Sequence, residues 1–441
     1  MSASLNLWSR AAHVAAQTPE SRNRYVDFLR ALSILMVITG HWLGTAPYFV
    51  NGELTLGSML EYQHWTHLLS WLFQVMPVFF LVGGYSNGVS WKAAVRDGRS
   101  YAEWLNGRLQ RLSGPVLPLL AVWAMLGIGG NLAGVHPDAV KIASQVSLIP
   151  IWFLAVYVGV VVVVPLTYAA WQRFGMKSFW ALAIAVAVDD FLFFAADLHS
   201  LGWFNYAFIW LAAHQLGYAW RDGKLQTGGK ALIWSVTGLA ILIGLVALGP
   251  YPLSMVSVPG EAVSNSLPPK LPMLLLGIIQ MGLVLALEAP VRRWLERPRP
   301  WTATVLVNGM IMTIFLWHLT ASTIVIGLAL QFGNVGLTLE PGSGAWWAAR
   351  PVWLGIYLIA LTGFVLVFGI FEHGGSGGPP AAAWRQIAGA VLMCGGLSFL
   401  ALGGIGGTSW LGLRWWVVLL PVAGAALAGV TPFVRAKVKG A

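Results

Sequence analysis

Three ionisable side chains lie in or beside an otherwise apolar stretch near the amino end of the chain: Asp27, Arg30 and His41. Arg30 and His41 are eleven residues apart, and at about 100° per residue a helix returns to nearly the same face over that interval. At about 1.5 Å of rise per residue, the imidazole would lie roughly 16 Å deeper than the guanidinium. Asp27 lies one turn before Arg30 and can pair with it. Ionisable groups inside a spanning helix usually mark function, so the stretch predicts a cation near one mouth and a base deep inside.

Two other apolar runs carry groups that can move protons. His318 lies in Phe315-Leu-Trp-His318 at a depth similar to that of His41, and Asp189 and Asp190 lie past the middle of another run. A lone histidine in such a run is more often a packing residue than a catalytic one, and for the aspartates the two readings are about even. Adjacent helical residues point about 100° apart, so at most one aspartate faces a shared cavity, and the sequence leaves open which one.

A pair of arginines, Arg108 and Arg111, is spaced by one helical turn just before Gly114-Pro115. Two guanidinium forks on one face match the geometry of phosphate oxygens. For either arginine alone, anchoring at the inner membrane surface is the simpler reading. The pair predicts an anion site at the entrance of a helix.

The composition excludes a soluble protein. Of the 441 residues, 57% are hydrophobic and 10% are charged, whereas a soluble domain carries about 25% charged residues. The single cysteine, Cys394, excludes an intrachain disulfide and a cysteine metal site. No metal site is expected.

Apolar runs recur along the whole chain and predict an all-α polytopic transmembrane bundle of twelve spans. The runs are residues 26–46, 65–91, 108–132, 146–169, 177–196, 203–221, 231–250, 270–289, 303–331, 350–372, 384–406 and 411–431. With the amino terminus inside, 21 of the 26 Lys and Arg residues lie in inner segments, which predicts an N-in, C-in protein of the cell membrane. The same asymmetry accounts for the net charge of +10 without nucleic acid as a partner.

Four regions follow from this pattern. Residues 1–21 are mixed and polar, lack the apolar core of a cleaved signal peptide, and are expected to be a mobile or surface-lying cytoplasmic segment. Residues 22–372 form a ten-span core, and residues 373–383 form a linker rich in Gly and Pro. Residues 384–441 hold an accessory two-helix hairpin and a basic tail, and the hairpin is a candidate for docking a protein partner.

Several of these segments together resemble the membrane acyltransferase-3 family. They are Asp27-Phe-Leu-Arg30 with His41, Phe79-Phe80 with Gly83-Gly84, Arg108-x-x-Arg111, Trp152-Phe-Leu and Leu316-Trp-His318, in the order usual for the family and over residues 22–372. One departure is that the family's Ser-Gly reads Gly83-Gly84 here, so no catalytic role is assigned to this segment. From the residues alone, close helix packing is the favoured reading of the two glycines.

The resemblance implies transfer of an acyl group, often acetyl, from cytoplasmic acyl-coenzyme A to a sugar, glycolipid or other hydroxyl acceptor of the cell envelope at the outer face. Arg30, Arg108 and Arg111 would bind the donor, His41 would act as general base, and Asp190 or His318 would orient His41 or bind the acceptor. Two other functions stay open: a transporter or lipid flippase, and a non-catalytic scaffold of an envelope assembly. The lack of an evident internal repeat counts against the transporter, and the same-face Arg30–His41 pair counts against the scaffold.

Overall fold

The structure, a computed structural model, describes residues 7–373 and 379–432. Within these ranges, nine helical segments are long and apolar enough to cross a membrane, and a tenth is added if the bent pair Pro137–Leu148 and Ile151–Val162 is one span. The predicted all-α polytopic bundle is thus confirmed. The described part also contains one two-stranded sheet, β1 (Thr45–Val50) with β2 (Glu53–Ser58), which we did not predict.

All twelve predicted runs contain helix, but three do not form single long spans, and a fourth, residues 303–331, breaks after Gly309 and continues as the helix Ile311–Gln331. Residues 146–169 hold the bent pair and the start of the next helix, with a 49° bend between the pair. Residues 203–221 and 411–431 hold helices of 17 and 14 residues, shorter than a full crossing.

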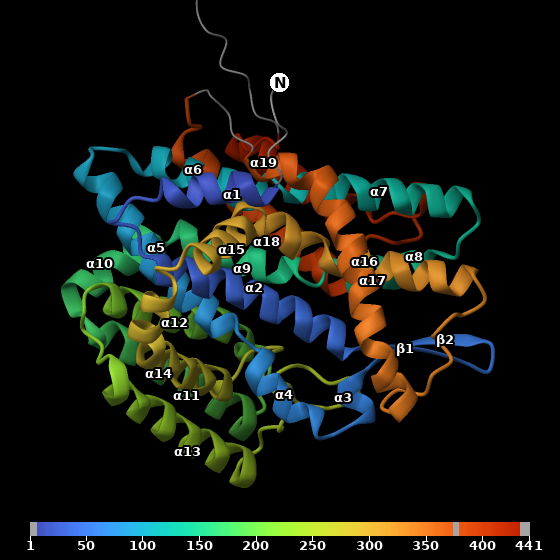
Figure 1. Cartoon of the computed structure of the whole chain (residues 1–441), viewed down its shortest axis with the longest axis horizontal. Coiled ribbons are helices and arrows are strands. Elements are labelled where there is room, and N and C mark those ends of the chain that lie inside the picture. The colour runs from blue at the N-terminus through green and yellow to red at the C-terminus, as the bar shows by residue number, and fades with distance from the viewer. Residues whose placement is uncertain (1–6, 374–378, 433–441) are drawn as a thin grey trace, which may run out of the picture. The chain divides into compact units, whose positions relative to one another are not determined.

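The chain divides into two compact units. Unit 1 comprises residues 1–46, 56–90 and 164–309. Its helices are α1 (Leu7–Ala16), α2 (Arg24–Gly44), α3 (Met59–Tyr62), α4 (Thr66–Phe73), α5 (Met76–Arg96, in this unit through Ser90), α10 (Val164–Phe174), α11 (Met176–Ala195), α12 (Asn205–Arg221), α13 (Leu232–Leu248), α14 (Leu271–Trp294) and α15 (Pro298–Gly309), with short 3-10 turns at Leu201–Phe204 and Gly228–Ala231. Figure 1 shows α11, α12, α13 and α14 as neighbours in this unit.

Two glycines let α5 and α12 approach closely inside unit 1. A Cβ added to Gly84 would overlap the backbone carbonyl of His214, and one added to Gly217 would overlap that of Leu81. The rings of Phe80 and Trp210 stack beside this crossing, with centroids 4.6 Å apart. Gly84 therefore serves helix packing, the reading favoured from the sequence.

Unit 2 comprises residues 47–55, 91–163 and 310–441. Its helices are α6 (Tyr101–Ser113), α7 (Val116–Leu132), α8 (Pro137–Leu148), α9 (Ile151–Val162), α16 (Ile311–Gln331), α17 (Gly344–Phe368), α18 (Ala383–Gly403) and α19 (Trp415–Ala428), with 3-10 turns at Gly369–His373 and Trp410–Gly412. The α18–α19 hairpin packs on α6, α8 and α9. The hairpin belongs to the same compact unit as α6–α9. Its description as an accessory element stays a prediction. Most of the predicted linker, residues 374–378, lies outside the described residues.

The helix α1 at the amino end was not among the predicted helices. It packs on α15, and the indole N–H of Trp301 donates hydrogen bonds to the carbonyl of Ala15 and the hydroxyl of Thr18. An alanine pair, Ala11 and Ala15, forms its buried face. Because its contacts lie almost 300 residues away in the sequence, local hydropathy could not reveal this helix.

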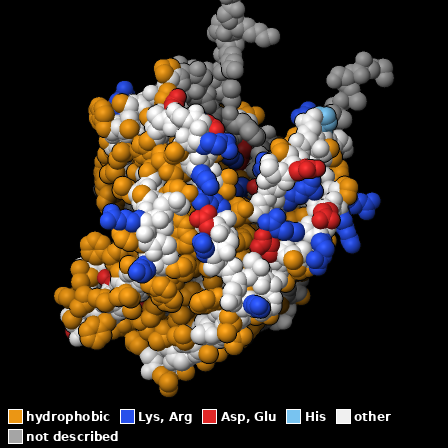
Figure 2. Space-filling model, turned by 90° about the vertical axis from the view of Figure 1, so that its left-hand side faces the viewer, with side chains coloured by type: hydrophobic (Ala, Val, Ile, Leu, Met, Phe, Trp, Pro, Cys, Tyr) orange, Lys and Arg blue, Asp and Glu red, His pale blue; other side chains and the backbone are white. Residues whose placement is uncertain are grey.

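The exposed helix faces are apolar. Figure 2 shows one side of the molecule, on which hydrophobic side chains cover a broad area and charged side chains are scattered through the middle and right of the view. In α13, Ile233, Val236 and Ile243 are more than half exposed, and in α17, Ile359 and Leu366 are too. Soluble proteins rarely expose apolar surface on this scale. Together with the length of the helices, this indicates a multi-pass membrane protein.

Candidate active site

The first part of the candidate site is a cluster of two arginines on one carboxylate in unit 1. Asp27, which is 6% exposed, accepts a hydrogen bond from Arg30 at 3.2 Å and one from Arg22 at 2.6 Å. A second nitrogen of Arg30 donates to the hydroxyl of Ser86 on α5 at 3.0 Å. The pairing of Asp27 with Arg30 was predicted, while Arg22, just before the helix, was missed. Two guanidiniums and one carboxylate leave a net positive charge at the start of α2.

The sequence around these residues explains why α2 begins where it does. Asn23 caps the helix, with its side chain accepting hydrogen bonds from the N–H groups of Tyr25 and Val26. Its amide nitrogen also donates to the hydroxyl of Tyr85 on α5. An asparagine at this position satisfies N–H groups that have no partner within the helix. The cap thereby fixes the first turn, which carries Asp27.

His41 lies in the last turn of the same helix. Since α2 runs without interruption from Arg24 to Gly44, the eleven-residue spacing holds, and His41 and Arg30 share a face with about 16 Å of axial offset. The carbonyl of His41 accepts hydrogen bonds from both the N–H and the hydroxyl of Thr45, the latter at 2.7 Å. These bonds end the helix and fix the backbone that carries the imidazole.

Asp190, also in unit 1, is tied to three separate elements. One carboxylate oxygen accepts from Asn205 at 2.9 Å, and the other accepts from the hydroxyl of Tyr251 at 2.9 Å and from the N–H of Leu271 at 2.7 Å. The carboxylate thus caps α14 and anchors the segment that precedes it. Its predicted role beside His41 stays a prediction.

A buried lysine beside these aspartates, Lys270, was not among the predicted site residues. Its side chain is fully buried, and its amino group lies 3.5 Å from the ring centroid of Phe193. Burial lowers the pKa of Lys270 below its usual value, although Asp190 and Asp189 oppose that shift. Burial and the neighbouring Asp190 carboxylate raise the pKa of Tyr251. In the sequence, the adjacent carboxylates of Asp189 and Asp190 were the one feature that indicated a nearby cation.

The predicted anion site lies on α6 in unit 2. Ser100 and Glu103 form a reciprocal cap at the start of this helix. Arg108 is half-buried with its guanidinium 5.7 Å from the ring centroid of Trp104, and Arg111 is exposed. Since α6 is continuous from Tyr101 to Ser113, the two arginines are one turn apart along the helix. Their role as an anion site stays a prediction.

His318 is fully buried in α16, also in unit 2. Its Nδ1 lies 2.6 Å from the carbonyl of Phe315. A carbonyl can only accept, so Nδ1 is the donor in this contact. The Phe315 ring packs edge-on against Phe153 of α9, with centroids 5.5 Å apart.

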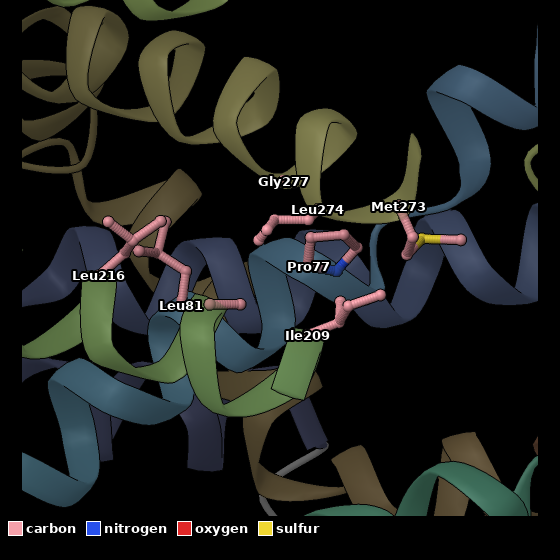
Figure 3. A pocket seen from close by; sticks show the side chains of 8 residues that line it. Pro77, Leu81, Ile209, Leu216, Met273, Leu274 and Gly277 are labelled. Atoms are coloured by element: carbon pink, nitrogen blue, oxygen red, sulfur yellow. The ribbon is translucent and has the colours of Figure 1, made fainter. Parts of the chain in front are cut away.

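A small cavity among apolar residues lies in unit 1 and is shown in Figure 3. Its volume is about 10 Å³. Its lining is wholly apolar and includes Pro77, Ile209, Met273 and Gly277. A dry space of this size is a packing gap, and we assign it no ligand. Among the residues with described placement, no group of three or more His, Cys, Asp or Glu side chains could hold a metal ion.

Comparison with known families adds to this geometry. A family model described as the acyltransferase domain of the acyltransferase-3 family matches residues 23–369. The chain belongs to this family. Searches of curated proteins and of solved structures returned no match. Family membership and the spanning helices together support a membrane acyltransferase.

The match covers every predicted site residue and ends before α18. Two contacts, one within each unit, lie at or next to these motif segments. In unit 1, Arg30 contacts Ser86, two residues after Gly83-Gly84. In unit 2, the segments that contain Phe153 and Phe315 contact each other. Residues far apart in the sequence are thus brought together by the fold.

Proposed function

We propose that the protein moves an acyl group, often acetyl, from acyl-coenzyme A to a hydroxyl of a sugar or glycolipid of the cell envelope. The donor would enter from the cytoplasm and the acceptor from the outer face of the cell membrane, with both chain termini inside. Membrane lipid surrounds the protein in this proposal, and nucleic acid has no part in it.

One observation carries the proposal: a single unbroken helix holds a fixed guanidinium at one end and an imidazole on the same face near the other. Asp27 and Ser86 hold two different nitrogens of Arg30. The guanidinium is therefore oriented before a ligand arrives. Preorganisation of this kind favours binding, because less side-chain entropy is lost on association.

In the proposed mechanism, Arg30 and Arg22 supply positive charge where the anionic part of the donor substrate enters. The extended pantetheine arm of the donor would then have to carry the thioester about 16 Å along α2 to reach His41. His41 accepts the proton of the acceptor hydroxyl while the oxygen attacks the thioester carbon. The carbon–sulfur bond breaks, and the imidazolium returns the proton to the departing thiolate. The products are an ester and the free thiol of coenzyme A, so atoms and charge balance.

Other residues take supporting parts in the proposal. Arg108 and Arg111 bind donor phosphates with paired guanidinium forks. His318 is proposed to orient His41 or to bind the acceptor. Asp190 is proposed to help position the acceptor through the segment that it anchors.

The test is acyl transfer from labelled acetyl-coenzyme A to envelope extracts, with the purified protein in vesicles. His41→Ala should lower turnover at least about 100-fold, the lower range for a positioned proton transfer, and leave donor affinity within about twofold. His41→Gln should fail equally, because an amide fills the space but cannot act as a base. His13→Ala, on the exposed face of α1, is the matched control and should behave as the wild type.

Transfer retained by a folded His41→Ala protein would remove His41 from the mechanism. A transporter would instead show solute flux that depends on His41 and no acylated product in any variant.

A further inference from the structure

The helix that carries Arg108 and Arg111 is held at both ends by the α18–α19 hairpin. At its carboxyl end, the Gln110 amide donates to the carbonyl of Gly429 at 2.7 Å and accepts from the N–H of Thr431 at 3.1 Å. At its amino end, the Gln386 amide of α18 donates to the carbonyl of Ala102 at 3.0 Å. All of these groups belong to unit 2.

Both glutamines are buried, Gln110 at 4% exposure and Gln386 at 0%. A buried amide that loses its partners costs free energy, because water cannot replace them. The Gln110 side chain uses both its donor and its acceptor on backbone groups just beyond α19. The contact therefore favours one rotation of α6 about its axis and disfavours other rotations.

The geometry of a helix connects this contact to the arginines. Gln110 lies between them in the sequence, about 200° around the axis from Arg108 and about 100° from Arg111. Fixing Gln110 on the buried face thus fixes the direction in which both guanidiniums point. At a radius of about 6 Å, a rotation of 20° moves a side-chain end by about 2 Å, which is enough to break a hydrogen bond.

The hairpin is itself fastened to the rest of unit 2. Gln145 of α8 donates to the carbonyl of Leu402 at 2.8 Å, and the Ser144 hydroxyl accepts from the N–H of Ile405 at 2.9 Å. Within the hairpin, α18 and α19 cross closely, since a Cβ added to Gly389 would overlap the carbonyl of Gly424. Because the α18–α19 hairpin is closely packed and fastened to the rest of unit 2, its contacts can fix the position of α6.

We propose that the α18–α19 hairpin is a positioning element for donor binding, and that Gln110 is the residue through which it sets the rotation of α6 and the aim of Arg108 and Arg111. This inference rests on the proposed function, in which those arginines bind donor phosphates. It assigns a role to a part of the chain that the family match, ending at residue 369, does not include.

The test compares two equal substitutions, each at a glutamine that donates a hydrogen bond to the hairpin region. Gln110→Met keeps the length of the side chain and removes both hydrogen bonds to the region beyond α19. Gln145→Met removes one exposed hydrogen bond between the hairpin and α8, leaves the Ser144–Ile405 bond and the packing of α18 on α9, and does not change a contact of α6. Binding of coenzyme A and acetyl-coenzyme A is measured by calorimetry in detergent, and KM and kcat are measured in vesicles.

Gln110→Met should raise the donor Kd and KM by about 2- to 30-fold, the range of coupling through packed networks, while kcat at saturating donor changes less than twofold. Gln145→Met should leave both constants within twofold. A purely structural role of Gln110 would instead lower thermal stability and the active fraction without changing the Kd of the folded protein, and that result would overturn the proposal. If Gln110→Met does not fold, Gln386→Met tests the same idea at the other end of α6, with the same expected and contrary results.

The variant that replaces both Arg108 and Arg111 with alanine separates this inference from the proposed function. If it loses donor affinity while Gln110→Met does not, the proposed donor site stands and the positioning role falls. If it keeps full donor affinity, the donor site falls, and the positioning role falls with it.

Discussion

Replacing Asp27 with asparagine would remove the one negative charge between Arg22 and Arg30 while keeping the shape of the side chain. The Asp27–Arg30 contact is a charge-assisted hydrogen bond, a class worth about 1.5–3 kcal/mol. The Asp27 side chain is 8% exposed and that of Arg30 is 26% exposed, so solvent screens the pair only in part. Arg22 is 54% exposed and adds at most about 1 kcal/mol. Asparagine retains one carbonyl oxygen, so the expected loss in the free energy of unfolding is about 2 kcal/mol.

The assay is thermal unfolding of the purified protein in detergent. A loss of this size corresponds to roughly 2–4 °C in Tm for a chain of this length, scaled from smaller domains. The matched control is Asp97→Asn, which removes a carboxylate that pairs with Arg96 and Arg99 at the surface. That variant should change the free energy of unfolding by less than about 0.5 kcal/mol.

Equal melting temperatures for Asp27→Asn and Asp97→Asn would refute this reasoning. The guanidinium of Arg30 would then not depend on Asp27 for its position. The argument that α2 carries a preorganised cation would lose its physical basis.

Three further predictions concern topology, packing and pH. A cysteine placed near Gly98 should be labelled only from the cytoplasm and one near Ser343 only from outside; labelling on the opposite sides would reject the proposed orientation. Gly84→Ala should destabilise unit 1 by about 3 kcal/mol through backbone overlap. The control Gly244→Ala in α13, which has open space around it, should not destabilise the protein. Similar unfolding curves for the two variants would contradict the close crossing of α5 and α12. Tyr251→Phe should cost about 1–3 kcal/mol. Because the folded protein holds this phenol neutral, the wild type should lose stability as pH rises above about 10, and the variant should lose less; equal slopes for the two proteins would exclude this contribution.

The repeated apolar runs were sufficient to predict the helical bundle, because lipid requires long helices with internally satisfied backbones. The relation between Arg30 and His41 was also predictable, since it depends only on helix geometry. The turn between β1 and β2 was not predicted, although the sequence Asn51-Gly52 is typical of a two-residue β-hairpin turn. Both residues have positive φ in the structure, as such a turn requires.

Other features depend on partners too distant in the sequence to read. Residues 303–331 looked like one span, yet the helix breaks between α15 and α16. The carboxylate of Glu372 accepts hydrogen bonds from the N–H groups of Met312 and Thr313 and from the hydroxyl of Thr313, and so caps the start of α16. A cap supplied from about 60 residues away leaves no local pattern. The same holds for buried Lys270, whose position follows from the packing of α11 and α14.

The hydrogen-bond partners of Asp190 all follow it in the sequence, so they are synthesised after it. Asn205 follows it by 15 residues, but Tyr251 and Leu271 follow by 61 and 81. At about 5–20 residues per second, the ribosome needs roughly 4–16 s to synthesise the last of these partners. During that time α11 carries a carboxylate whose insertion into lipid costs about 2.5–3.5 kcal/mol at a helix centre. We therefore expect α11 to be less stably inserted in the bilayer until these partners have been synthesised. In nascent chains that end before residue 251, α11 should be inserted less stably than in chains that extend past residue 271.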